Sequence, residues 1–477
     1  MVFSSPVFLF CYLPIALIGF FLVPVRARTP LLFAMSLLFY AWGEGHYVWL
    51  LLLSIALNWL LALALERSEA PRSRRMFLAG AVALNIGALV YFKYANFLVA
   101  NFAPLAVYVG LQAPTVAAIH LPIGISFVTF EALAYVVDVY RRHTGARKNP
   151  IHVGFYMSFF PHLIAGPIMR FDDVADRLAA PRTTAPYFES GVRRFTVGLA
   201  KKVLLANTMG RVADDAFHLV ADSLGCTTAW LGIVAYALQI YFDFSGYTDM
   251  AIGLGRMCGF ELPRNFDLPY SAASIRDFWR RWHISLSRWF RDYLYIPLGG
   301  NRGSALKTYR NLVLVFFCCG LWHGASWTFV IWGLYHGVFL VLERLRFGRW
   351  LSALWSPLQH AYALLVVLIG WVFFRAESFS QALAFLGAMS GFGTGSALSS
   401  VAEHLDREEL LALIIGLPIA TLPVVRWLEQ AAGRISALPG ATLVLNLTRT
   451  AVLLGALLVC GAYLAAGTYN PFIYFRF

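Results

Sequence analysis

Long runs of apolar residues, separated by short polar connections, dominate the amino-acid sequence. A helix that crosses a membrane needs about 20 predominantly apolar residues. Runs of this kind occupy residues 6–24, 47–65, 77–98, 120–139, 228–256, 311–342, 360–375, 408–424 and 446–466. Shorter or amphipathic candidates lie near residues 31–42, 104–119, 151–168, 191–208 and 275–296. The pattern predicts an all-α polytopic membrane protein with roughly ten to twelve transmembrane or re-entrant helices, organised as a single multi-pass domain over residues 1–477.

The composition agrees with this pattern. Hydrophobic residues make up 59% of the 477 positions and charged residues 13%. These values exclude an ordinary soluble enzyme, because a soluble fold cannot bury so much apolar surface. The formal net charge is +13, but the basic residues gather in the short connections. Cytoplasmic loops of membrane proteins carry this excess of Lys and Arg, so the charge indicates a lipid bilayer as partner and no nucleic acid.

The positions of the basic residues also predict the topology. Residues 94–140 contain no Lys or Arg, and basic loops at 67–75 and 141–148 flank them. We therefore expect both loops in the cytoplasm and residues 99–119 outside. The run 311–342 has basic residues at both of its ends, so we expect it to enter and leave on the cytoplasmic side, as a hairpin or as one helix with a broken partner. Its turn falls near Trp322-His323-Gly324, which places His323 inside the membrane.

Residues 275–296 have the periodicity of an amphipathic helix. Apolar residues recur at spacings of three and four along one face, and arginines occupy the opposite face. This arrangement predicts an interfacial helix whose arginines face anionic lipid on the cytoplasmic surface. A compatible interpretation gives Arg280, Arg281 and Arg288 a second role, which is to bind the phosphates of a nucleotide-bearing donor. His283 lies on this helix, near the boundary between its two faces.

Several polar residues interrupt the apolar runs. The predicted spans contain the acidic residues Glu131, Asp138, Asp243 and Asp249. The stretch "FFPHLIAGPIMR" (159–170) combines two prolines and a glycine with His162, so it cannot form a simple spanning helix. For each residue alone, a hydrogen bond between packed helices is the simpler interpretation. Together they favour a polar cavity inside the bundle, because irregular backbone at membrane depth needs protein or water around it.

His323 is the most informative of these residues. The stretch "CCGLWHGASWTF" (318–329) places its titratable imidazole in an apolar run. A structural histidine is the simpler interpretation of one such residue on local sequence alone. No ligand set with metal spacing surrounds it, so we assign no metal site. The functional alternatives are a proton relay and a general base, since burial favours the neutral imidazole that a base requires.

Many motifs in one order connect the chain to a known family. They include "LPIGISFVTFEALAYVVDVYRR", "FFPHLIAGPIMR", "YFDFSGYTDMAIGLGRMCGF", "DFWRRWHISLSRWFRDYLYIPLGGNR" and "LWHGASWTFVIWGLYHG". The sequence resembles the membrane-bound O-acyltransferases, specifically their bacterial alginate O-acetyltransferase branch, nearly from end to end. The resemblance implies a ring of helices around a central tunnel. It also implies that His323 matches the active-site histidine and that His283 matches a second histidine common in this branch.

The same resemblance carries expectations about substrates and partners. It implies acetyl-CoA as a cytoplasmic acyl donor, with no permanently bound cofactor, and an exported polysaccharide, alginate first, as the eventual acceptor. The expected partners are an extracytoplasmic acetyltransferase of the SGNH type and the polysaccharide export machinery. The expected location is the bacterial inner (cytoplasmic) membrane.

The end of the chain has the form F-x-Y-x-x-F over residues 472–477. One interpretation is an aromatic anchor at the membrane interface. The stretch also resembles the C-terminal motif of a small partner in teichoic-acid D-alanylation, in which a tyrosine is proposed to carry the acyl group. By that resemblance, Tyr474 is a third candidate catalytic residue, an acceptor that His323 deprotonates.

Other functions remain open on the sequence alone. Peptidoglycan or another exopolysaccharide would replace alginate without any change that we can identify in this chain. Teichoic-acid D-alanyl transfer is a further alternative within the same fold. A transporter that uses the same polar cavity belongs to a different class, and it accounts for the acidic residues but not for the tail motif.

Overall fold

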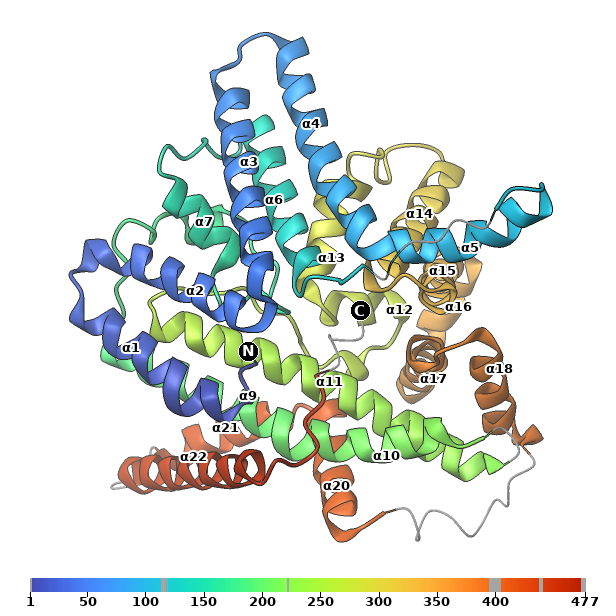
Figure 1. The fold of residues 1–477 in the computed structure, drawn as a ribbon. Helices are drawn as coiled ribbons and strands as arrows, with labels where there is room; N and C mark the ends of the chain where they lie inside the picture. The colour runs from blue at the N-terminus through green and yellow to red at the C-terminus, as the bar shows by residue number, and fades with distance from the viewer. Residues whose placement is uncertain are drawn as a thin grey trace.

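The apolar runs form helices throughout the part of the chain that the structure describes. A computed structural model describes residues 2–112, 117, 119–220, 223–393, 405–436 and 441–472. Helices joined by short connections make up these residues, and no strand occurs among them (Figure 1). The prediction of an all-α protein is confirmed.

The helices fall into three consecutive groups along the chain. The first contains α1 (Leu13–Leu22), α2 (Arg28–Glu44), α3 (Val48–Arg67), α4 (Pro71–Leu89), α5 (Ala95–Tyr108), α6 (Ile125–Tyr140) and α7 (Pro150–Ser158). The second contains α8 (Asp172–Ala175), α9 (Ala185–Ala200), α10 (Asn207–His218), α11 (Cys226–Met257), α12 (Ile275–Arg281), α13 (Ile284–Phe290), α14 (Ala305–His323) and α15 (Trp327–Leu342). The third contains α16 (Arg346–Ala353), α17 (Ser356–Arg375), α18 (Phe379–Gly387), α20 (Arg407–Thr421), α21 (Val424–Ser436) and α22 (Ala441–Ala465).

Helix α11, with 32 residues, runs through the centre of the molecule and packs closely on α9. Glycines make this approach possible. A Cβ atom added to Gly246 would lie 2.7 Å from the carbonyl oxygen of Gly198, and one added to Gly253 would lie 2.6 Å from that of Gly191. Small residues let helix backbones approach in this way inside membranes, where packing replaces the hydrophobic effect between helices.

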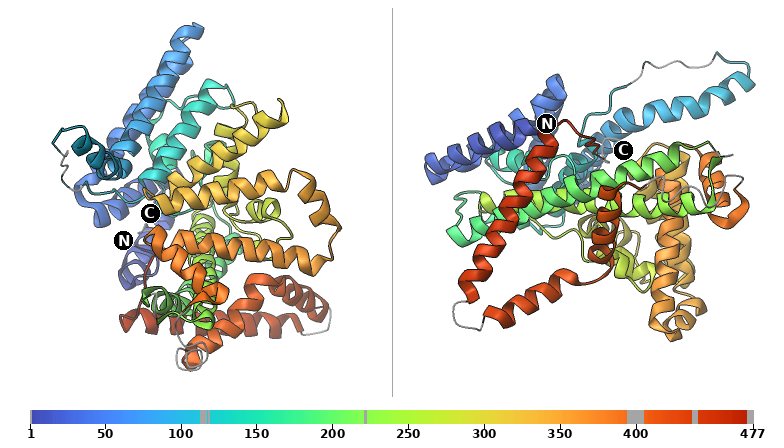
Figure 2. Two further views of the ribbon diagram at one scale, coloured as in Figure 1. Left: turned by 90° about the vertical axis from the view of Figure 1, so that its right-hand side faces the viewer. Right: turned by 90° about the horizontal axis from the view of Figure 1, so that it is seen from below.

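Four helical stretches among the described residues are long and apolar enough to cross a membrane. They are Val25–Arg67, Pro71–Tyr108, Ser356–Arg375 and Ala441–Ala465. Two bent pairs, α15 with α16 and α20 with α21, would raise this number to six if each pair forms one span. Figure 2 shows α22 at the periphery of the molecule, where only 6% of its most apolar window is buried. The total of ten to twelve membrane segments and the single-domain organisation stay predictions.

The structure confirms two packed helices and a turn over residues 311–342, while entry and exit on the cytoplasmic side stay a prediction. Helix α14 ends at His323 and α15 begins at Trp327, so the turn lies where the charge pattern placed it. The two helices pack through glycines, because a Cβ atom on Gly333 would lie 2.2 Å from the carbonyl oxygen of Phe316. This close packing holds His323 at the tip of a short, rigid pair of helices.

The prediction of one continuous helix over residues 275–296 is wrong. Helix α12 ends at Arg281, Trp282 is extended, and His283 has a left-handed conformation with φ of 43° before α13 begins. Asn265 stabilises the break: its backbone carbonyl accepts the Ile284 N–H at 3.0 Å, and its side chain accepts the Ser285 N–H at 3.1 Å. The apolar face of the segment packs inside the protein, where Phe278, Trp282 and Leu286 are buried. A contact from twenty positions away therefore overrides the local periodicity.

The acidic residues of the predicted spans pair with groups on neighbouring segments. The pairs are Asp243 with Lys202 at 2.9 Å, Asp249 with Lys201 at 2.6 Å and Arg194 at 2.9 Å, Glu131 with His162 at 3.1 Å, and Asp138 with the Tyr293 hydroxyl at 2.6 Å. Each carboxylate thus joins two parts of the bundle. These contacts match the simpler interpretation of the residues and weaken the transporter alternative, which needs them in a shared pathway.

Candidate active site

His323 is the last residue of α14, and its side chain is buried among aromatic rings. Its imidazole lies 4.8 Å from the ring of Trp322, 4.9 Å from Trp332 and 5.2 Å from Phe374, measured between centroids. The next residue, Gly324, ends the helix in an extended conformation. A Cβ atom there would lie 2.2 Å from the Phe329 ring, so the turn beside His323 has no space for a larger residue.

His323 borders a cavity of about 330 Å³, which we call the histidine cavity. Its wall comes from four distant parts of the chain: Lys93, residues 120–127, Ile164, and the end of α14 at Trp322 and His323. Residues 120–124 lead into α6 from the neutral segment that we predict to be extracytoplasmic. The cavity therefore borders His323 from the side of the chain that carries no basic loop.

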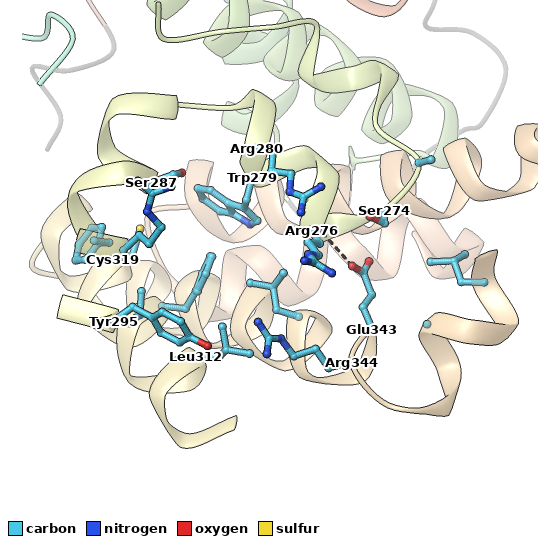
Figure 3. A pocket seen from close by; sticks show the side chains of 18 of the residues that line it. Ser274, Arg276, Trp279, Arg280, Ser287, Tyr295, Leu312, Cys319, Glu343 and Arg344 are labelled. Atoms are coloured by element: carbon cyan, nitrogen blue, oxygen red, sulfur yellow. Dashed lines mark hydrogen bonds between the residues drawn. The ribbon is translucent and has the colours of Figure 1, made fainter. Parts of the chain in front are cut away.

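A second cavity, of about 440 Å³, lies between α12, α13, α14, α15 and α16, and we call it the arginine cavity. Four guanidinium groups line it, those of Arg276, Arg280, Arg291 and Arg344. Figure 3 shows three of them, Arg276, Arg280 and Arg344, near Glu343, with Tyr295 and Cys319 at the other end of the cavity. The cavity combines an apolar wall with a strongly basic rim, which suits a ligand that has an anionic and an apolar part.

Glu343 is the acidic residue among these arginines, and its carboxylate is hydrogen-bonded to backbone groups. It lies in the connection between α15 and α16, and its carboxylate accepts the backbone N–H groups of Ile275 at 2.6 Å and Arg276 at 2.9 Å. Burial raises the pKa of the Glu343 carboxyl, against the opposing effect of these N–H donors. Because the carboxylate is hydrogen-bonded to the backbone of α12, the guanidinium groups of Arg276, Arg280 and Arg344 remain available to an anion, whereas that of Arg291 pairs with Asp292 at 2.7 Å.

The three arginines that the sequence predicted for donor binding do not share one site. Arg280 lines the arginine cavity. Arg288 lines a third cavity, of about 290 Å³, on another side of α13. Arg281 instead pairs with Asp277 at 2.9 Å. Arg344, which follows the end of α15, lines the same cavity as Arg280, and no sequence pattern links these two residues.

The two cavities meet α14 on successive turns. Cys319 lines the arginine cavity and His323, four positions later, lines the histidine cavity. One turn of an α-helix rises about 5.4 Å. Residues four apart lie on the same face of a helix, so the two cavities border α14 about one turn apart along that face. The structure contains two separate cavities at this part of α14, and the central tunnel stays a prediction.

His283 and His323 both lie beside the ring of Trp322. The ring of His283 is fully buried, 6.0 Å from the ring of Trp322 and 4.7 Å from that of Phe244. Its Nδ1 lies 3.2 Å from the side-chain oxygen of Asn265. The indole of Trp322 thus lies beside the rings of both histidines.

Tyr474 lies outside the described residues. The chain just before it is attached to the interior: Asn470 donates to the carbonyl oxygen of Ser4 at 2.7 Å, and Lys202 donates to that of Pro471. Phe472 is buried, with its ring 4.9 Å from that of Tyr247. The start of the F-x-Y-x-x-F motif therefore packs against α11.

Lys93 and Tyr94 are residues of this site that the sequence analysis missed. Both bind the end of α14, with the Tyr94 hydroxyl donating to the carbonyl oxygen of Leu321 at 2.6 Å and the Lys93 ammonium donating to that of Trp322. A signal was present, since Lys93 is the sole Lys, Arg, Asp or Glu between residues 76 and 130. The residue lies inside the apolar run 77–98, and that pattern predicts only a spanning helix.

Comparisons with known proteins agree with this arrangement. The sequence profile of the membrane-bound O-acyltransferase family matches residues 123–378. A probable alginate O-acetylase of Azotobacter vinelandii is 40% identical over the full length of both chains. A peptidoglycan O-acetyltransferase of Helicobacter pylori is 36% identical over 86% of this chain and 82% of its own. A teichoic acid D-alanyltransferase of Bacillus subtilis is 27% identical over 53% of this chain and 66% of its own.

The chain therefore belongs to the membrane-bound O-acyltransferase family. It is a multi-pass membrane protein and an acyltransferase. The family match includes both histidines and the whole of the arginine cavity, whereas Lys93 lies before its first residue.

Proposed function

We propose that this acyltransferase moves acetyl groups from cytoplasmic acetyl-CoA across the inner membrane for the O-acetylation of an exported polysaccharide. The observation that carries this proposal is the position of His323, one helical turn from the arginine cavity and at the wall of the histidine cavity. A donor on the basic side and an acceptor on the other side would meet at this residue.

The arginine cavity suits the donor. Arg276, Arg280 and Arg344 would bind the phosphates of the nucleotide part, as charge-assisted hydrogen bonds favour. The apolar wall formed by Trp279, Phe316 and Cys319 would accept the uncharged arm that ends in the thioester. Arg280 keeps the role that the sequence suggested, while Arg281 and Arg288 would act outside this cavity.

His323 would act as the general base. Its neutral imidazole takes the proton of an acceptor hydroxyl as that oxygen attacks the thioester carbon. The new C–O bond forms, the C–S bond breaks, and the imidazolium returns the proton to the departing thiolate. A positioned base of this kind contributes about 10²- to 10⁴-fold to a rate. His283 would support the reaction through Trp322.

Alginate is the acceptor that we favour, because the alginate O-acetylase of Azotobacter vinelandii matches the whole chain and the teichoic acid D-alanyltransferase matches half of it. The peptidoglycan O-acetyltransferase is nearly as similar, so peptidoglycan is the second candidate. An extracytoplasmic acetyltransferase of the SGNH type and the export machinery would complete the transfer. Tyr474 is the proposed first acceptor within this chain.

The test is hydrolysis of acetyl-CoA by the purified protein in detergent, in which water replaces the acceptor hydroxyl and CoA is released. We expect release by the wild type and its loss in His323→Ala. Equal release by both proteins, or none by either, would contradict the proposed reaction. The transporter alternative would then be favoured. Tyr474→Phe is tested separately: polysaccharide acetylation that survives this change in cells would leave the tail as an anchor and remove the relay.

A further inference from the structure

The end of α14 is buried, which raises the question of how its carbonyl groups are satisfied. The last four carbonyl oxygens of an α-helix have no partner within the helix, and a buried end needs partners from elsewhere. In α14 these oxygens belong to Gly320, Leu321, Trp322 and His323. A free polar group in such surroundings would destabilise the turn that carries the histidine.

All four oxygens have partners. The N–H of Gly324 donates to Gly320 at 3.3 Å. The Tyr94 hydroxyl donates to Leu321 at 2.6 Å. The Lys93 ammonium donates to Trp322 and, at 3.4 Å, to His323. Two consecutive side chains from the first third of the chain therefore complete the end of the helix that carries the proposed base.

Several contacts hold the Lys93 side chain in this position. The side chain is buried, its ammonium also lies 3.5 Å from the Ser126 hydroxyl, and it lies 5.9 Å from the centre of the Trp322 ring. A cation is stabilised at a helix C-terminus by the partial negative charge there, and an indole face at this distance adds to the attraction. The same ammonium lines the histidine cavity, so its contacts fix one wall of that cavity.

The backbone around Lys93 explains how two neighbouring residues reach the same helix end. Val90–Tyr94 form a π-helical turn, η4, between α4 and α5. A π-turn inserts one extra residue into the helix and redirects its side chains, and such turns are frequent at functional sites. Here the turn places Lys93 and Tyr94 on the carbonyls of Leu321, Trp322 and His323 together.

From this geometry we infer that Lys93 is a positioning residue for acyl transfer, acting through His323, with Tyr94 as its neighbour in the same clamp. The inference rests on the proposed role of His323 as the base. The ammonium holds the backbone of residues 322 and 323, and that backbone sets the direction of the imidazole toward the cavity. Removing the ammonium leaves the donor site intact, because the hydrogen bonds of Lys93 go to Ser126, Trp322 and His323, none of which lines the arginine cavity.

The decisive experiment compares kcat and KM for acetyl-CoA in purified Lys93→Met, Lys93→Arg and Tyr94→Phe, each normalised to the monodisperse, folded fraction. Met keeps the length of the side chain and removes the charge. We expect Lys93→Met to lower kcat about 10- to 100-fold, as displacement of a catalytic group by about 1 Å does, with KM within about twofold of the wild type. Arg should restore part of the loss, and Tyr94→Phe should lower kcat less.

Lys148→Met is the matched control, because Lys148 is exposed in a loop between α6 and α7, and it should match the wild type. A kcat for Lys93→Met equal to that of the wild type would overturn the inference. So would a loss that Lys93→Arg does not restore at all, or one that appears equally in KM. If Lys93→Met does not yield folded protein, Tyr94→Phe and Lys93→Arg decide by the same division between kcat and KM. Failure of the proposed function itself would appear differently, as an inactive wild type or an active His323→Ala.

Discussion

The two cavities on α14 differ in how the chain builds them. The arginine cavity is lined by residues 273–359, a single continuous part of the sequence, and basic groups surround its opening. The histidine cavity collects residues 93, 120–127, 164 and 322–323 and has few charged groups. The first has the chemistry of a binding site for an anion, and the second places a buried imidazole beside a mostly uncharged wall. We therefore expect the two to affect different kinetic constants.

The largest expected effect comes from His323→Gln, which keeps a polar side chain but removes the base. The account predicts a fall in kcat of about 10³-fold, within the range for loss of a general base, with little change in KM for acetyl-CoA. Release of CoA under saturating donor measures it. If His323→Gln retains most of its kcat, the histidine cavity is not the reaction site and the two cavities do not differ in this way.

The arginine cavity should behave in the opposite way. The double variant Arg276→Gln, Arg280→Gln removes two guanidinium groups, and we expect KM for acetyl-CoA to rise about tenfold or more with kcat within about twofold. Arg281→Gln is the matched control, since Arg281 pairs with Asp277 and does not line the cavity. An equal rise in KM for Arg281→Gln would mean that the donor binds elsewhere on α12.

Gly333→Ala tests the element that both cavities share. A Cβ atom at Gly333 would lie 2.2 Å from the carbonyl oxygen of Phe316, so α14 and α15 must move apart. We expect a loss of about 1–3 kcal/mol in stability, seen as a lower thermal transition in detergent, together with changes in both kcat and KM. Gly455→Ala in α22, where a Cβ atom meets nothing within 4 Å, is the control and should unfold like the wild type.

The smallest expected effect is that of salt, which should change KM for acetyl-CoA but not kcat. Arg276 and Arg280 are exposed, so an increase in ionic strength screens their attraction for phosphate. Between about 0.05 and 0.5 M salt, we expect KM for acetyl-CoA to rise a few-fold while kcat stays nearly constant. A salt dependence confined to kcat would contradict the assignment of the donor to the basic side.

The sequence predicted those features that depend on nearby residues. Apolar runs predicted the helices, and basic residues at both ends of 311–342 predicted the hairpin with its turn at His323. Arginine periodicity found Arg280, because the arginine cavity is local in sequence. The motifs indicated the family, which the family match confirms, and the same resemblance pointed to His283 and His323.

Features that depend on distant residues could not be predicted. Asn265 breaks the predicted helix at His283 through hydrogen bonds that no periodicity records. Lys93 contacts Trp322 across 229 positions, so its role emerged only when the fold brought the two together. The acidic residues were visible in the sequence, but their cationic partners were not identified until the helices were packed.

Equilibrium binding of CoA to the purified protein tests the division between the two cavities most directly, because it needs no turnover and no acceptor. The account predicts that His323→Gln binds CoA as tightly as the wild type, while the Arg276→Gln, Arg280→Gln double variant binds about tenfold more weakly. Loss of binding in His323→Gln, or unchanged binding in the double variant, would contradict it.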